Sequence, residues 1–339
     1  GDSRFRINYL DELEDDFYNF TNAYTSAPST IMSAASMFTG VETIKIARNY
    51  SDWKFNIDQI KPLYQYLNNK NFKNFPIDNS KRAREMLKDL MGVLNYKSHE
   101  KFARHHSNWS NVDMLSIFKN IIKKNNKDFK YVLSWLDCRG DANIESIVKG
   151  HINYLKENNQ YDDSLIIINS DHGYPDPNAI KTTNIVGNRH DLIVTEDNIK
   201  VPLMLKIPGL KPRTIDEKVS LIDILPTITD LLNIKLEHEV DGISLVSLLK
   251  SNDKTNIDNR IIRTDTRLLL QEGKITCLIK NDLKYVYYHD NDLSEIYNLK
   301  EDPSELINFA KNENYKNKLN YFKDEYKKRD TEIFKDQEK

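Results

Sequence analysis

An apolar run that ends at an Asp-His-Gly triplet is the feature that most constrains this chain. The run lies within Ser164–Asn169, and Ser-Asp-His-Gly follows at 170–173. A short stretch of Leu and Ile without polar alternation is typical of a strand buried on both faces of a mainly parallel sheet. In open α/β sheets ligands bind beyond the carboxyl ends of the strands. Asp171 and His172 therefore stand where a ligand site is expected.

Further segments surround this run at the spacing of an α/β protein. Tyr131–Leu136 predicts a second buried strand, and residues 143–158 between the two strands have helical length and spacing. The three segments form a βαβ unit. Val201–Ile207 predicts another strand, and Ile222–Leu232 predicts an amphipathic helix. We therefore expect an α/β fold with a doubly wound, mainly parallel sheet and helices on both faces.

The pattern changes after about residue 255. Lys274–Ile279 and Leu283–His289 read as short β-strands, and Asn312–Lys328 reads as a charged helix. We therefore expect a catalytic domain over residues 1–255 and a small C-terminal antiparallel subdomain with a terminal helix over residues 256–339.

The composition narrows the classes of partner. The chain has 49 basic and 51 acidic residues, so its net charge of -2 gives no global attraction to nucleic acid. No apolar run approaches the roughly 18 residues of a membrane-spanning helix. Cys138 and Cys277 are too few for a disulfide framework. Partners must therefore be inferred from a site, and the oligomeric state stays open.

Asp171 and His172 allow two interpretations. An adjacent carboxylate and imidazole can ligate Zn²⁺ or Mn²⁺, whereas Ca²⁺ would use oxygen ligands and not His172 directly. Alternatively, Asp171 caps the following turn and His172 is an ordinary hydrogen-bonded loop residue. The triplet alone does not decide between them.

Phe20–Gly40 is the second segment that could form part of a reactive site, because it is rich in small and hydroxylated side chains. A loop at Pro28 followed by a helix through Ser33–Ser36 would present free backbone N–H groups and a positive dipole end. A Ser or Thr there can act as a nucleophile if a metal lowers the pKa of its hydroxyl. Ordinary helix capping is the alternative.

Phe20–Gly40 resembles the nucleophile segment of the sulfatase branch of the alkaline phosphatase superfamily, and in that register the nucleophile is Thr30. Five more elements resemble the family's motifs in the family's order: Asp171-His172-Gly173, 199–203 (Ile-Lys-Val-Pro-Leu), 221–227 (Leu-Ile-Asp-Ile-Leu-Pro-Thr), 241–245 (Asp-Gly-Ile-Ser-Leu) and 295–305 (Glu-Ile-Tyr-Asn-Leu-Lys-Glu-Asp-Pro-Ser-Glu). Six motifs in order are a specific signal.

The resemblance implies an alkaline phosphatase-like fold and a site around a divalent metal ion, Zn²⁺, Mn²⁺ or Ca²⁺. Asp171, His172 and an upstream acid would ligate the ion, and Thr30 would attack an ester. His190 falls near the place where relatives carry a Lys or His that touches the transferred group. It is therefore expected to act in catalysis, with the neighbouring Arg189 contacting substrate.

The segment 104–109 gathers Arg, two His, Ser, Asn and Trp. In related headgroup transferases a His and a Trp from this region bind substrate, so the resemblance implies substrate contacts for His106 and Trp109. A polar surface loop anchored by Trp109 is the alternative.

The nucleophile departs from the sulfatase pattern. A sulfatase carries Cys or Ser within Cys/Ser-x-Pro-x-Arg and converts it to formylglycine, which threonine cannot become. A register over Ser26–Thr30 would restore the proline but breaks the flanking alignment and lacks the arginine. Relatives that cleave or transfer phosphodiester, phosphoethanolamine and phosphoglycerol groups use threonine. We therefore expect a phosphate-type ester, with a sulfuric ester as the alternative.

The opening strand of the family, which carries the first metal acid, has no counterpart here. Ile7–Leu13 resembles the element that follows this strand, and no hydrophobic segment precedes Ile7. We expect either that the strand lies upstream of Gly1 or that the chain is a divergent member of the family. Asp2 is the nearest substitute ligand. A catalytically inactive scaffold is the second alternative. The family's habit favours a small-molecule, glycan or lipid-headgroup substrate and an extracytoplasmic or periplasmic location.

Overall fold

Strand β1 (Tyr18–Tyr24) lies inside the larger sheet, which has the order β6-β7-β1-β8, with β9 also pairing with β1. The computed structural model describes residues 8–48, 50–51, 54–55, 60–78, 87–91, 111–125, 127–136, 144–175, 190–266 and 273–335. Strand β7 (Lys200–Lys206) runs antiparallel to both β1 and β6 (Ile166–Asn169), whereas β8 (Thr214–Ile215) and β9 (Val219–Ser220) run parallel to β1. The sheet is therefore mixed.

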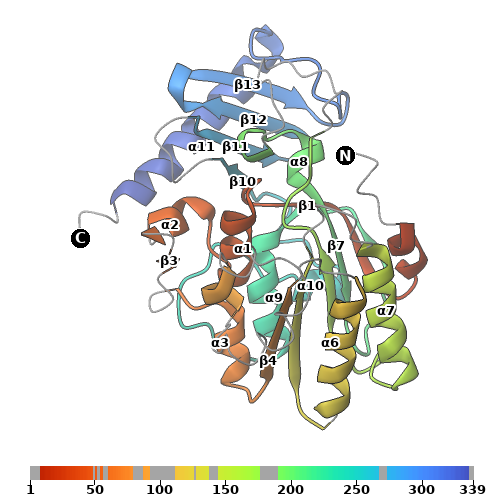
Figure 1. Cartoon of the computed structure of the whole chain (residues 1–339). Helices are drawn as coiled ribbons and strands as arrows, with labels where there is room; N and C mark the ends of the chain where they lie inside the picture. The colour runs from red at the N-terminus through yellow and green to blue at the C-terminus, as the bar shows by residue number, and fades with distance from the viewer. Residues whose placement is uncertain are drawn as a thin grey trace.

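Helices cover the two faces of this sheet (Figure 1). Leu203 and Leu205 of β7 pack into the cluster that contains α1 and α9, whereas Met204 packs into the cluster that contains α6 and α7. This alternation follows from the two-residue period of a strand. The helices concerned are α1 (Thr30–Thr39), α3 (Leu63–Asn68), α9 (Ile224–Leu231), α10 (Val246–Ser251), α6 (Asn111–Lys124) and α7 (Ile144–Glu157).

A second sheet of four antiparallel strands stands at the other end of the molecule in Figure 1. Helix α11 (Lys316–Lys335) packs on it, with Phe322 stacked on Tyr285 at a centroid distance of 5.7 Å. The strands are β10 (Ile262–Asp265), β11 (Ile275–Lys280), β12 (Leu283–Tyr288) and β13 (Leu293–Asn298).

Short elements connect these parts. They are η2 (Asn8–Leu13), α2 (Thr43–Arg48), β2 (Tyr50–Ser51), β3 (Lys54–Phe55), η3 (His190–Leu192), α8 (Glu196–Ile199), η4 (Leu221–Asp223), η5 (His289–Asn291) and η6 (Glu313–Tyr315). In the described parts of the chain, no helix combines the length and the apolar character that crossing a membrane requires.

The predicted strands and helices are found within a few residues of their expected bounds. The terminal helix differs most, because α11 runs over Lys316–Lys335 instead of ending at Lys328. The sequence pattern also did not reveal β4 (Lys73–Asp78), which pairs in parallel with β5 (Lys130–Trp135).

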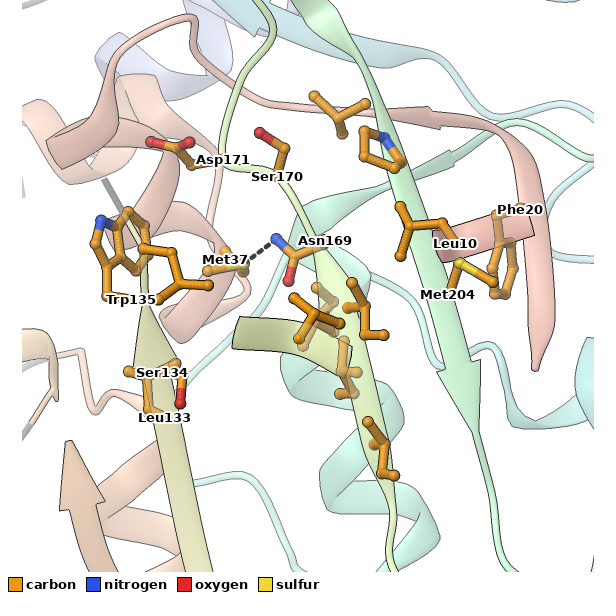
Figure 2. Close-up of a pocket in the computed structure, with 18 of the residues that line it drawn as sticks. Leu10, Phe20, Met37, Leu133, Ser134, Trp135, Asn169, Ser170, Asp171 and Met204 are labelled. Carbon is orange, nitrogen blue, oxygen red and sulfur yellow. Dashed lines mark hydrogen bonds between the residues drawn. The ribbon is translucent and has the colours of Figure 1, made fainter. Parts of the chain in front are cut away.

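Strands β5 and β6 differ from the prediction in their burial. Among the described residues β5 pairs with β4 alone and β6 with β7 alone, so neither strand has a partner on its other edge. Residues 130–136 and 165–170 line one cavity, and the side chains of both strands are half-buried. We call this space the β5–β6 cleft. Figure 2 shows Leu133, Ser134 and Trp135 on one side of it and Asn169 on the other.

Two motif elements of the sequence support helix α1. Gly40 ends this helix in the left-handed conformation (φ 70°), and its main-chain oxygen accepts hydrogen bonds from the N–H groups of Asp241 and Gly242, both at 2.9 Å. The fully buried Asp223 accepts hydrogen bonds from the N–H of Ile243 at 2.9 Å and from Arg260 at 2.6 Å. These residues therefore act structurally.

Candidate active site

Thr30 and His172 meet at the edge of the larger sheet. Thr30 is the first residue of α1, and His172 follows β6 by three residues. Thr30 Oγ1 lies 3.3 Å from His172 Nε2, and both residues line the cavity that includes the β5–β6 cleft. Ser29, the N-cap residue, makes no side-chain capping bond. The hydroxyl of Thr30 thus points toward an imidazole.

The tautomer of His172 follows from its other nitrogen. Nδ1 lies 2.7 Å from the main-chain oxygen of Gly173, and a carbonyl oxygen can only accept. Nδ1 therefore carries a proton, and in the neutral ring Nε2 presents a lone pair toward Thr30. Such fixing of one ring nitrogen is how proteins orient a histidine that binds a metal or accepts a proton.

Asp171 presents a carboxylate to the same point. Its Oδ2 lies 3.5 Å from His172 Nε2, with side-chain exposures of 19% for Asp171 and 13% for His172. In Figure 2 the Asp171 carboxylate lies at the end of β6 beyond Ser170. Asp171 is also held through its backbone, because the fully buried Ser33 donates to the Asp171 main-chain oxygen at 2.6 Å.

His190 stacks on His172. Their ring centroids are 4.5 Å apart and the planes differ by 12°, and the ring centroid of Tyr174 lies 5.5 Å from that of His190. His190 begins the 3₁₀ turn η3 and lines the same cavity. The structure therefore brings together Thr30, Asp171, His172 and His190.

The loop before Thr30 is fastened by the C-terminal sheet. Thr264 in β10 donates its hydroxyl to the main-chain oxygen of Thr25 at 2.6 Å, and the N–H of Asp265 donates to the oxygen of Ser26 at 3.0 Å. Thr25 in turn donates to Ser33 Oγ at 2.8 Å. The second sheet therefore helps to position the first turn of α1.

The donor set fits a divalent cation in part. A carboxylate and an imidazole lone pair face each other 3.5 Å apart with no proton between them in the neutral ring, and a hydroxyl lies alongside. This oxygen and nitrogen chemistry suits Zn²⁺ or Mn²⁺ better than Ca²⁺. The described residues contain no group of three or more His, Cys, Asp or Glu side chains that could hold a metal. A complete shell therefore needs a further ligand.

Four predicted residues cannot be placed. Asp2, His106, Trp109 and Arg189 lie outside the described residues. Their expected roles, as an upstream ligand and as substrate contacts, remain predictions.

Sequence reasoning missed the second layer of this site. The sequence pattern indicates Ser33 only as part of a helix of small residues, although Ser33 follows Thr30 by three positions, the spacing that places two residues on one helix face. Asn198 is fully buried and donates to the main-chain oxygen of His190 at 2.7 Å. Its position just before the Val-Pro-Leu strand was the one available signal.

Two protein-family models match adjoining and overlapping parts of the chain. The model described as "Sulfatase" matches residues 141–234, and the model described as "N-sulphoglucosamine sulphohydrolase, C-terminal" matches residues 189–332. The chain belongs to the sulfatase family. This family is part of the alkaline phosphatase-like superfamily, as the motif order had indicated.

Individual sulfatase-family relatives agree with this placement. A choline-sulfatase of Rhizobium meliloti (strain 1021) is 32% identical over 110 residues, which cover 31% of this chain and 20% of the relative. The curated relatives are matched over 10% to 20% of their own length. The match therefore does not show that this chain has the activities or substrates of these relatives.

Solved structures show the sulfatase fold over nearly the whole chain. Ps i-CgsB in complex with k-i-k-neocarrahexaose has a TM-score of 0.75 at 18% identity and covers 97% of this chain and 88% of that chain. The phosphonate monoester hydrolase SpPMH from Silicibacter pomeroyi has a TM-score of 0.73 at 15% identity, covering 97% and 91%. The predicted α/β fold is therefore confirmed. The sulfatase family models match Asp171, His172 and His190 but not Phe20–Gly40, so the match does not test the role of Thr30.

Proposed function

We propose that this protein is a metal-dependent hydrolase or transferase of the sulfatase family that cleaves a phosphate-type ester with Thr30 as nucleophile. The observation that supports this most is the 3.3 Å approach of Thr30 Oγ1 to the Nε2 lone pair of His172, beside the Asp171 carboxylate. A threonine cannot be converted to formylglycine, and one structural neighbour of the fold is named a phosphonate monoester hydrolase.

Asp171 and His172 would hold the cation, together with a further acid. A bound divalent cation would polarise an ester oxygen and lower the pKa of a nearby hydroxyl. The Thr30 hydroxyl loses its proton to solvent and its oxygen forms a bond to phosphorus, while the bond from phosphorus to the leaving oxygen breaks. His190, protonated, supplies a proton to that leaving oxygen. Water or an acceptor alcohol then displaces phosphorus from Thr30, which is regenerated.

We propose that the missing acid belongs to a β-strand seated in the β5–β6 cleft and supplied by polypeptide upstream of Gly1. Both facing strand edges lack a described partner, and the cleft runs along β5 and β6 to the site. Leu10 of η2 lines the same cavity, so the first described residues lie beside it. A parallel strand there would end beside Asp171.

The strand is tested by hydrogen exchange. In a form of the protein that includes its natural upstream sequence, the edge amides of β5 and β6 should exchange much more slowly than in residues 1–339. Equal exchange in the two forms would remove this part of the proposal. Concentration-dependent protection in residues 1–339 would instead identify a second copy as the source.

Turnover tests the reaction. The extended form, supplied with Zn²⁺, Mn²⁺ or Ca²⁺, is assayed with a chromogenic phosphodiester and with an aryl sulfate. Faster cleavage of the phosphodiester supports the proposal. Faster cleavage of the sulfate establishes a sulfuric-ester hydrolase, which the family models and the choline-sulfatase match favour. Cleavage of neither ester, with the metal bound, leaves an inactive sulfatase-like scaffold.

The expected substrate is an anionic ester of a small molecule, a glycan or a lipid headgroup. A cation held by Asp171 and His172 beside Thr30 would attract such an anion, and His190 lines the same cavity. We propose an extracytoplasmic or periplasmic location, following the habit of the family.

A further inference from the structure

Asn198 contacts both halves of the candidate site through different atoms. Its side chain is fully buried, and Nδ2 donates to the main-chain oxygens of His190 at 2.7 Å and of Ile193 at 2.5 Å. Its own main-chain oxygen accepts the N–H of Gly173 at 2.7 Å. Asn198 therefore links the segment that holds His172 to the turn that begins at His190.

We propose that Asn198 is a positioning residue that sets the His190 ring against the His172 ring. The two rings stack with centroids 4.5 Å apart, although they come from segments on either side of residues 176–189. The turn η3 spans three residues, and its closing bond from the N–H of Ile193 to the oxygen of His190 is 3.3 Å long. The Asn198 amide adds two shorter bonds across the same turn.

The chemistry of this contact requires an amide. Two carbonyl oxygens converge on Nδ2, and carbonyls accept hydrogen bonds only, so the group between them must donate twice. An aspartate of the same shape would place a carboxylate against two carbonyl oxygens. Because the position is buried, water would not replace the lost bonds, and the two carbonyl oxygens left without a donor would destabilise the turn.

Helix α8, which carries Asn198, is itself fixed from the second sheet. The N–H of Glu196 donates to the Glu305 carboxylate at 2.7 Å. The fully buried Lys284 of β12 lies 2.7 Å from Glu305 and 3.2 Å from Glu196. Burial alone would lower the pKa of Lys284, but the two carboxylates outweigh it and raise the pKa, so the lysine stays charged.

The contact with Gly173 is equally tight. A Cβ atom at Gly173 would lie 2.3 Å from the main-chain oxygen of Asp197 and 3.0 Å from Asn198 Cα. Because only glycine fits at this contact, the distance between the segment that holds His172 and helix α8 is fixed. Contacts from the C-terminal sheet therefore position α8, and Asn198 of α8 in turn positions His190.

The test is Asn198→Asp, with Asn198→Ser as a second variant that removes the amide without adding charge. Asn74→Asp is the matched control, because Asn74 Nδ2 also donates to a main-chain oxygen, that of Met91 at 2.7 Å, away from this site. In NMR spectra of imidazole-labelled protein, the His172 and His190 ring signals should shift in the Asn198 variants and not in the control.

Turnover adds a test that rests on the proposed function. Loss of ring placement should lower kcat by about 10²-fold with KM little changed. In a His190→Ala background, Asn198→Ser should change kcat by less than about 2-fold, because residues that act through one another are not additive. Additive losses in this cycle, or unchanged ring signals in both variants, would overturn the positioning role. If wild-type protein cleaves no ester, the proposed function fails while the NMR result still decides this inference.

Discussion

The hydroxyl of Ser33 lies 2.6 Å from the main-chain oxygen of Asp171, which fastens the helix that begins at Thr30 to the segment that ends β6. Ser33 also accepts the Thr25 hydroxyl at 2.8 Å. One side chain therefore sets the distance between the proposed nucleophile and the proposed metal ligands.

Ser33→Ala should separate these elements. Because the bond is buried, we expect a loss of about 1–3 kcal/mol in the free energy of unfolding, together with a fall of about 10–10²-fold in ester turnover. Ser36→Ala is the matched control, since Ser36 is fully buried on the same helix and bonds Thr43 Oγ1 at 3.1 Å. Denaturant unfolding and a turnover assay measure both variants. A Ser33→Ala protein as active as the control would contradict the prediction.

Thr30→Ala should abolish turnover of phosphodiesters in the form with a complete site, because the attacking oxygen is gone. Thr30→Ser should retain activity. Metal affinity, measured by calorimetry, should fall only in part in Thr30→Ala, since the Asp171 and His172 donors remain. Full activity of Thr30→Ala would show that another group attacks the ester.

His190→Ala and His172→Ala should differ in bound metal. His190 is expected to act on the substrate, so its removal should lower turnover by about 10²–10⁴-fold with metal content unchanged. Removal of His172 should reduce metal affinity. Elemental analysis of the two purified variants distinguishes these roles, and loss of one ion in His190→Ala would place this imidazole among the ligands.

His151 should make stability depend on pH. Its ring stacks on Phe118 at 4.1 Å, and burial lowers the pKa of His151 from 6.5 to about 4. Between pH 6.5 and 4 the unfolded chain binds a proton that the folded chain does not, so the free energy of unfolding should fall as pH falls, by up to about 1.4 kcal/mol per pH unit. His151→Phe should flatten this dependence in urea titrations, and an unchanged slope would contradict the assignment. His289, with a pKa lowered to about 4 by burial, and His238, whose pKa is also lowered by burial, should add to this slope.

Lys284→Met should destabilise the protein by about 3–5 kcal/mol, because it leaves the buried carboxylate of Glu305 and the half-buried carboxylate of Glu196 without a cation. Lys45→Met is the control. Lys45 forms an ion pair with Asp241, but its side chain is 43% exposed, and exposed ion pairs contribute little to stability. Thermal or urea unfolding measures both. Adding Glu305→Gln should recover part of the Lys284→Met loss; failure to do so would argue against uncompensated charge as the cause.

Strands β5, β6 and β7 could be predicted, because buried apolar runs follow local rules. The convergence of Thr30 with His172 was implied by the resemblance to the sulfatase family and not by either local pattern. Strand neighbours could not be predicted. The βαβ pattern places β5 and β6 in one sheet without saying whether they pair, and no described bond joins them.

The contacts that support the site could not be predicted from the sequence, for a different reason. Ser33 and Asp171 are 138 positions apart, and nothing in either local pattern selects the other. Asn198 meets Gly173 through its main-chain oxygen, an atom that every residue has. Such contacts are set by how elements pack after they form.

The bond between Thr264 and Thr25 joins positions that are 239 residues apart. Closing so long a loop takes place late, because the entropy of the intervening chain must be given up first. During synthesis the loop before Thr30 therefore lacks its bonds to β10 until that strand has emerged from the ribosome. A polypeptide released before that strand would fold much of the larger sheet and still lack a properly held nucleophile. The proposed activity would thus begin only after β10 has been made, and products that end before this strand would not cleave esters.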